Sequence, residues 1–224
     1  MMVMHCYALE RFPNMDTTAL DSSLQEELKH LNRKIVVLDD DPTGIQTVHG
    51  VSVYTDWKQE TLEAAFSEEN AMFFVLTNSR GMTVEETTAA HKEIAYNLAA
   101  AAEKIGCDYL IISRSDSTLR GHYPLETAIL REETEKLRGK KFSGEIIYPF
   151  FMEGGRYTFG NVHYVKEGEY LIPAGQTEFA KDKSFGYTAS DLTVWCEEKT
   201  EGAYNSIFYR FFCFCVINFL VFIG

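Results

Sequence analysis

The chain has 224 residues, of which 46% are apolar, and its formal net charge is −12. A chain of this length and apolar content can bury the core of one domain. Its acidity argues against nucleic acid as a partner, because nucleic-acid binding needs a basic face. The five cysteines lie at positions 6, 107, 196, 213 and 215 without zinc-ligand spacing, which indicates reduced thiols in a cytoplasmic protein.

Residues 1–33 are predicted to be an N-terminal extension. Its opening residues lack the basic and apolar regions of a signal peptide. The segment "DSSLQEELKHLNR" (21–33) predicts a short amphipathic helix. Ser22 or Ser23 would cap this helix, because each is followed by a Glu three or four residues later.

From residue 34 onward, apolar runs alternate with segments of helical spacing. The runs "KIVVLD" (34–39), "AMFFVLT" (71–77), "YLIIS" (109–113) and "GEIIYPF" (144–150) predict buried strands, and "GVSVYT" (50–55) alternates like a strand. Helices are expected at 58–69, 83–105 and 123–138, the second with Thr83 as its N-cap and Gly106 as its stop. The order predicts an α/β fold with three layers: a mostly parallel, Rossmann-like sheet with helices on both faces.

Polar clusters follow three of the predicted strands, at the sheet edge where ligands bind in such folds. The first cluster is "DDDPTG" (39–44). A solvated turn is the simpler interpretation. However, three adjacent carboxylates repel one another and exceed what a turn needs, which favours a ligand-binding role.

The second cluster is "SRSDSTLRGH" (113–122), which combines two arginines, an aspartate and several hydroxyl groups. Arginine offers a planar fork that suits a carboxylate or phosphate, and aspartate suits the hydroxyl groups of a polyol. The alternative is an Arg–Asp pair that only holds a loop.

The third cluster is "PFFMEGGRYTFGNVHYV" (149–165), in which glycines surround Arg156. Its second half predicts a β-hairpin insertion that turns at "GN". His163 in this hairpin is interpreted as a packed histidine rather than a base. The mixed charges of "FAKDKSFGYTASDL" (179–192) are a weaker signal.

Together, an acidic cluster and two arginine-bearing loops at one sheet edge predict a site for a small polyhydroxy acid. The motifs "DDPTG", "RSDSTLRGH", "GRYTFGNVHYV" and "TEFAKDKSFGYTASDL" occur in an order that resembles the N-terminal domain of the four-carbon acid sugar kinase family. The resemblance covers residues 34–202. It implies a role in carbohydrate metabolism, in which ATP phosphorylates a hydroxyl group of erythronate, threonate or an oxo-tetronate.

The resemblance also implies which residues form the site. Asp41 is the expected catalytic residue, and the expected substrate-binding residues are Asp40, Asp41, Thr43, Gly44, Arg114, Asp116, Ser117, Arg120, Gly121, Gly155 and Arg156. Asp39 receives no role, and no metal-binding residue is assigned.

The cofactors implied are ATP and Mg²⁺, bound mainly by a C-terminal nucleotide-binding domain. No glycine-rich phosphate-binding motif appears in this sequence, and residues 203–224 read instead as an aberrant hydrophobic tail in place of that domain. The run 207–223 is interpreted first as translated non-coding or frame-shifted sequence and second as a tail anchor at the lower length limit for a membrane span. The oligomeric state stays open.

Two other functions were weighed. The chain could be a stand-alone sugar-acid-binding module without catalysis. It could also be a haloacid-dehalogenase-like phosphatase, because "VVLDDDPT" fits that DxDx[TV] signature with Asp39 as the nucleophile. The late acidic pair that such phosphatases need is not found in the sequence.

Overall fold

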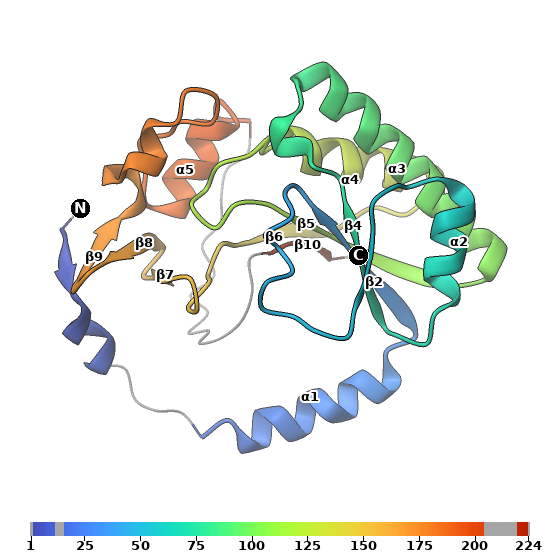
Figure 1. Ribbon diagram of the computed structural model, residues 1–224, viewed down its shortest axis with the longest axis horizontal. Helices are drawn as coiled ribbons and strands as arrows, with labels where there is room; N and C mark the ends of the chain where they lie inside the picture. The colour runs from blue at the N-terminus through green and yellow to red at the C-terminus, as the bar shows by residue number, and fades with distance from the viewer. Residues whose placement is uncertain (1, 12–15, 204–218, 224) are drawn as a thin grey trace.

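The computed structural model describes residues 2–11 and 16–203, together with the backbone of 219–223. Its larger sheet has six strands in the order β3-β4-β2-β5-β10-β6 (Figure 1). The strands are β2 (Arg33–Asp39), β3 (Ser52–Tyr54), β4 (Met72–Leu76), β5 (Asp108–Arg114), β6 (Gly144–Tyr148) and β10 (Phe219–Ile223). Neighbours from β3 to β5 are parallel. The α/β fold with a mostly parallel sheet is therefore confirmed.

β2 lies in the middle of this sheet because its apolar run can be buried on both faces. Val36 and Val37 are both fully buried, and Val36 lies opposite Phe73 of β4 and Ile111 of β5. The parallel register brings the carboxyl ends of β2, β4 and β5 to one edge of the sheet. The first two predicted clusters and the loop after β4 therefore start near that edge. The third cluster also starts there, because β6 runs in the same direction as β5: both pair antiparallel with β10.

The helices α2 (Gln59–Ser67), α3 (Val84–Ile105) and α4 (Leu125–Arg138) pack on this sheet. α3 begins with the predicted cap: the Thr83 hydroxyl accepts a hydrogen bond from the Glu86 amide, and the Glu86 side chain accepts one from the Thr83 amide. It ends at Gly106, whose positive φ of 74° is the left-handed conformation that favours glycine. The predicted bounds of this helix are confirmed.

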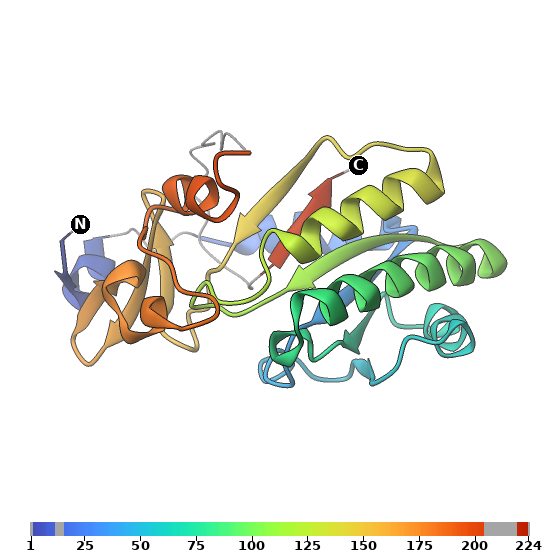
Figure 2. The same cartoon turned by 90° about the horizontal axis from the view of Figure 1, so that it is seen from above.

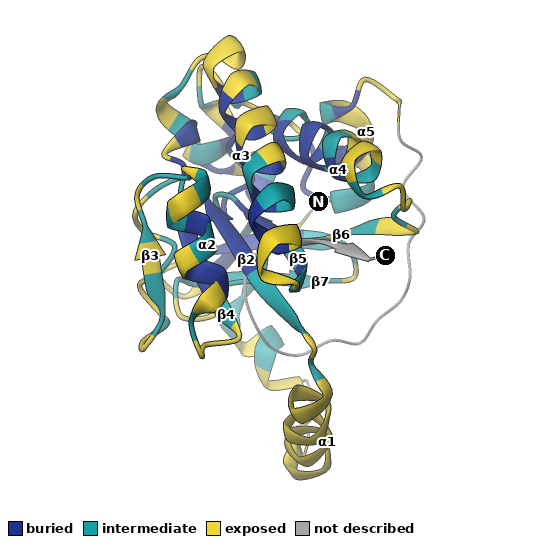
Figure 3. Ribbon diagram, turned by 90° about the vertical axis from the view of Figure 1, so that its right-hand side faces the viewer, coloured by how far each residue is buried: buried dark blue, intermediate teal, exposed yellow. Residues whose placement is uncertain are grey.

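Helices lie around the mostly parallel sheet, as expected, and three of them share one core. Side chains of α2, α3 and α4 all join one core cluster with Val36 and Leu38 of β2, and Figure 3 shows these buried faces gathered on one side of the sheet. The other face, around Val37, is covered by loop residues Ile45, Val48 and Val51. The reason is that the chain after β2 forms turns instead of a helix before it enters β3.

A second, antiparallel sheet with the order β1-β9-β8-β7 lies beside the first (Figure 2). The predicted hairpin is present as β7 (Arg156–Phe159) and β8 (Val162–Glu167), and it turns at Gly160 and Asn161, which both have positive φ. The insertion is nevertheless larger than a hairpin. β9 (Tyr170–Pro173), α5 (Leu192–Lys199) and the short helices η3 (Ala174–Gln176) and η4 (Glu178–Lys181) complete it.

The N-terminal extension is more ordered than the sequence indicated. β1 (Met4–His5) pairs with β9, and η1 (Cys6–Arg11) follows it. α1 spans Thr18–His30 with Thr17 in the N-cap position, so the helix begins before the predicted serine caps. None of its residues is buried, and its apolar side chains Leu20, Leu24 and Leu28 stay exposed.

In the tail, β10 pairs antiparallel with β5 and β6, an arrangement that the sequence analysis did not expect. Residues 204–218, and with them most of the hydrophobic run 207–223, lie outside the described part of the chain. No helix among the described residues is long and apolar enough to cross a membrane. Whether the tail replaces a nucleotide-binding domain stays a prediction.

Candidate functional site

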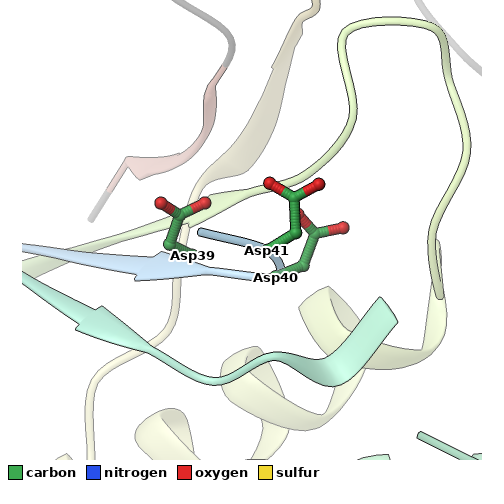
Figure 4. A group of neighbouring side chains, drawn as sticks. All are labelled: Asp39, Asp40 and Asp41. Carbon is green, nitrogen blue, oxygen red and sulfur yellow. The ribbon is translucent and has the colours of Figure 1, made fainter. Parts of the chain in front are cut away.

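Three carboxylates stand at the carboxyl end of β2, from Asp39, Asp40 and Asp41 (Figure 4). One oxygen from each lies within 4.8 Å of the others. Carboxylates this close repel one another when they are ionised. Two nearby arginines offset this repulsion. Arg114 Nη1, at the end of β5, lies 3.1 Å from Asp39 Oδ1 and 3.5 Å from Asp41 Oδ1.

The second cation is Arg80, which the sequence analysis missed. Arg80 lies in η2 (Ser79–Gly81), directly after β4. Its Nε and Nη2 donate to the two oxygens of Asp40 at 2.9 and 2.6 Å, and its Nη1 donates to Asp41. The polar run "TNSR" (77–80) could have indicated this residue, because it follows a predicted buried strand. That strand, β4, lies next to β2 in the sheet, so the run reaches the acidic cluster.

The three carboxylates differ in their affinity for protons. Burial raises the pKa of Asp39 to about 7, against the opposing charge of Arg114. Burial also raises the pKa of Asp40, although hydrogen bonds from Arg80 oppose it. For Asp41, hydrogen bonds from Thr43 and the two arginine charges outweigh burial, so its pKa is lowered. Asp41, whose side chain is partly exposed, is therefore ionised near neutral pH.

Thr43 and Gly44 shape the turn around these acids. The Thr43 amide donates to Asp41 Oδ1 at 2.8 Å. A Cβ on Gly44 would lie 2.0 Å from Asp39 Oδ2, so glycine is required there for close approach of the backbone to the carboxylate.

The loop after β5 joins the acidic cluster through Ser115. Its Oγ lies 3.0 Å from Asp40 Oδ2 and 2.9 Å from the Arg120 carbonyl oxygen. Further along, Arg120 Nε donates to Asp116 Oδ2 at 2.6 Å, and its Nη1 lies 3.8 Å from Asp182 Oδ2. The predicted Arg–Asp pair therefore exists, and it lies beside the acidic cluster rather than apart from it.

Gly121 closes this loop at a position that excludes larger residues. Its φ is +131°, and an added Cβ would lie 2.2 Å from Ser115 Oγ and 3.3 Å from Asp40 Oδ2. We expect Gly121→Ala to destabilise the protein by about 1–3 kcal/mol, because it combines backbone strain with an overlap. Thermal unfolding would measure this. Gly81→Ala is the matched control, since nothing lies within 4 Å of its Cβ position and its φ is unstrained; an equal loss in both variants would contradict the prediction.

The third cluster contributes Arg156 at the start of β7. Arg120 and Arg156 both place their guanidinium carbon near the ring of Phe179, at 5.0 and 5.7 Å from its centroid. Arg156 Nη1 donates to the Gly154 carbonyl, while its buried Nε has no hydrogen-bond partner among the described residues. Gly155 holds the preceding turn with a φ of +75°, packed against Lys166.

His163 is a packed histidine, as the sequence analysis proposed. It is completely buried, and burial lowers its pKa to about 4. Its Nε2 donates to the Ser117 carbonyl at 2.7 Å, and its Nδ1 lies 2.7 Å from Thr158 Oγ1. Ser117 is itself buried, so Ser117 supports the loop after β5. The hydrogen bond between His163 and Ser117 joins the antiparallel sheet to the second cluster.

An open pocket lies at the second cluster. Its lining includes the polar residues Ser115, Asp116 and Arg120 and the apolar residues Leu119 and Trp195. Asp40 and Asp41 do not line it, but Ser115 hydrogen-bonds to Asp40.

Comparison with known proteins identifies the family of this chain. The chain matches the family described as the sugar-binding N-terminal domain over residues 35–211. The chain belongs to that family, the sugar-binding N-terminal domain of four-carbon acid sugar kinases. The match includes every site residue predicted from the sequence and continues beyond residue 202. No match to an individually curated protein was found.

Membership of the sugar-binding N-terminal domain family does not favour the phosphatase alternative, and neither does the position of Asp39. A nucleophile must reach a substrate, whereas the Asp39 carboxylate is buried against Gly44 and paired with Arg114.

The spacing of the three aspartates also makes them a candidate Mg²⁺ site. Divalent magnesium prefers carboxylate oxygens and water, but the guanidinium groups of Arg80 and Arg114 already lie within hydrogen-bonding distance of these carboxylates. This donor set does not fit a divalent cation while both arginines keep these positions.

Proposed function

We propose that this domain binds a four-carbon sugar acid of the erythronate, threonate or oxo-tetronate type and presents one of its hydroxyl groups for phosphorylation. Family membership supports a sugar ligand. The evidence for an acidic ligand is the position of two arginines: Arg120 and Arg156 both pack against the ring of Phe179. In addition, the buried Nε–H of Arg156 has no hydrogen-bond partner among the described residues. A ligand carboxylate would satisfy this donor.

The neighbouring acids supply the complementary half of the proposed site. Asp40 and Asp41 are acceptors that match sugar hydroxyl groups. Asp41 is ionised and partly exposed, so in the proposal it orients the reacting hydroxyl group and accepts its proton. ATP and Mg²⁺ belong to a separate nucleotide-binding domain in this proposal, as the resemblance implies. The alternative is a binding module without catalysis, and ATP-dependent phosphorylation of a tetronate would decide against it.

Calorimetric titration of the full chain with erythronate, threonate and their oxo analogues tests the binding step. We expect a dissociation constant in the micromolar to millimolar range, about −4 to −8 kcal/mol. A folded sample that gives neither heat nor a thermal shift with any of these acids would contradict the proposal.

Replacing Arg120 by alanine should weaken this binding by about 2–5 kcal/mol, because a desolvated carboxylate would lose its charged partner. Arg120→Lys should also weaken it, since lysine lacks the bidentate fork. Arg138→Ala is the control: Arg138 also pairs with an aspartate, but Asp108 is at the opposite end of β5. Unchanged affinity in both Arg120 variants would show that the loop after β5 is purely structural.

A further inference from the structure

A carboxylic acid is buried beneath the acidic cluster, and the proposed chemistry does not use it. Glu126 lies in the first turn of α4 and is 3% exposed. Glutamate is rarely buried to this extent unless it is paired. Its pKa is raised to about 7, chiefly by burial and further by the negative charge of Asp40.

The partner of Glu126 is the hydroxyl group of Ser79, which donates to Glu126 Oε1 at 2.5 Å. Ser79 is fully buried and is the first residue of η2. The residue before it, Asn78, has a left-handed φ of 56°. The backbone thus turns sharply here, and the Ser79 hydroxyl ties the turn to α4.

The next residue in this turn is Arg80, whose amide donates to the Asp40 carbonyl at 3.2 Å while its side chain clamps the Asp40 carboxylate. Thr77, at the start of the turn, donates its hydroxyl to the Asp39 carbonyl at 2.9 Å. Three successive contacts therefore hold the turn after β4 against the acids after β2. Glu126 joins this network from α4.

His91 of α3 also lies near Glu126. Its Nδ1 lies 2.9 Å from the Thr87 carbonyl, which assigns the proton to Nδ1. Its Nε2 faces Glu126 Oε1 at 3.7 Å. The charged and titratable groups around Glu126 are thus His91, Arg80, Asp40 and His122.

We propose that Glu126 is a positioning residue for the sugar-acid site: through the Ser79 hydroxyl it fixes the turn that carries Arg80 and holds this guanidinium group against Asp40 and Asp41. The inference rests on the proposed function for its ligand, but the position of Arg80 can be measured without any ligand. Hydrogen-bond networks of this kind couple residues that do not themselves touch the ligand.

The test compares Glu126→Ala, Ser79→Ala and Glu126→Gln in the full chain. Glutamine keeps an oxygen that accepts from Ser79, so it should preserve the network, whereas both alanine variants remove it. The first measurement is exchange of the Arg80 Nε–H proton by NMR, with the resonance assigned from Arg80→Lys. We expect at least about tenfold faster exchange in the two alanine variants and wild-type behaviour in Glu126→Gln.

The second measurement is affinity for the tetronates, which should fall by about tenfold in the alanine variants. Thr134→Val is the control, because Thr134 is also buried in α4 but lies outside the network. If folded Ser79→Ala protein keeps the slow Arg80 exchange, or if Glu126→Gln loses it, the positioning role is overturned. If exchange responds as expected but wild-type protein binds no tetronate, the proposed function fails while the positioning role stands.

Discussion

Arg114→Ala is expected to destabilise the protein by about 3–5 kcal/mol, because it leaves the buried Asp39 carboxylate without its cation. Arg114 and Asp39 are both buried, with 3.1 Å between Nη1 and Oδ1, and Asp40 and Asp41 lie within 4.0 Å of the same guanidinium group. No other arginine is recorded against Asp39 among the described residues. Urea unfolding at neutral pH would measure the loss.

The matched control is Arg33→Ala, at the opposite end of the same sheet. Arg33 lies 3.9 Å from Asp108, and both side chains are exposed, so its loss should cost at most about 1 kcal/mol. Combining Arg114→Ala with Asp39→Asn should restore part of the stability, since one uncompensated carboxylate is removed. Equal losses for Arg33 and Arg114, or fully additive losses in the double variant, would contradict this account of the cluster.

His163→Ala should cost about 2–5 kcal/mol, through a cavity and through the unsatisfied Ser117 carbonyl. The more specific expectation concerns pH. The pKa of His163 falls from the ordinary 6.5 to about 4 in the folded chain, because burial disfavours the charged form. The unfolded chain therefore binds the proton first. The contribution of neutral His163 is fully present above about pH 6.5 and is lost as pH falls towards 4.

A comparison with His163→Asn isolates this effect from other groups. The raised pKa values of Asp39 and Glu126 act in the opposite direction: their contributions are present below the ordinary carboxyl pKa and are lost as pH rises through about 7. The difference in unfolding free energy between wild type and His163→Asn should therefore shrink as pH falls below about 6.5. A constant difference across this pH range would contradict the buried neutral histidine.

Strand and helix positions in the α/β part could be predicted because they depend on local patterns. β2 and α3 follow from a β-branched run and from a capped amphipathic segment, and both have nearly the predicted bounds. The predicted location of the site, at the carboxyl ends of β2 and β5, also follows from parallel pairing of neighbouring strands. The local prediction that was wrong is the N-terminus of α1: this helix begins at Thr18 and has no side-chain cap.

Other features depend on contacts between distant residues. Arg80 and Glu126 belong to the site only because β4 lies beside β2 and because α4 packs beneath the turn after β4. A lone arginine after a strand, or a glutamate in the first turn of a helix, is ordinary sequence, so neither residue stood out. The packing of Ile45, Val48 and Val51 against Val37 likewise depends on tertiary contacts, because a loop of that length has no periodic pattern.

The alternation of strands and helices, the edge of the sheet where polar clusters gather, and the family to which the chain belongs can all be predicted from the residues in their linear order. These properties are set by residue periodicity and by motifs of fixed spacing, which a linear sequence contains in full. Tertiary packing sets which cation pairs with which acid. Arg114 pairs with Asp39 and Arg80 pairs with Asp40, and of the three adjacent acids only Asp41 has a lowered pKa. Burial and distances of a few ångströms control these pairings, and both arise only when segments far apart in the chain are packed together.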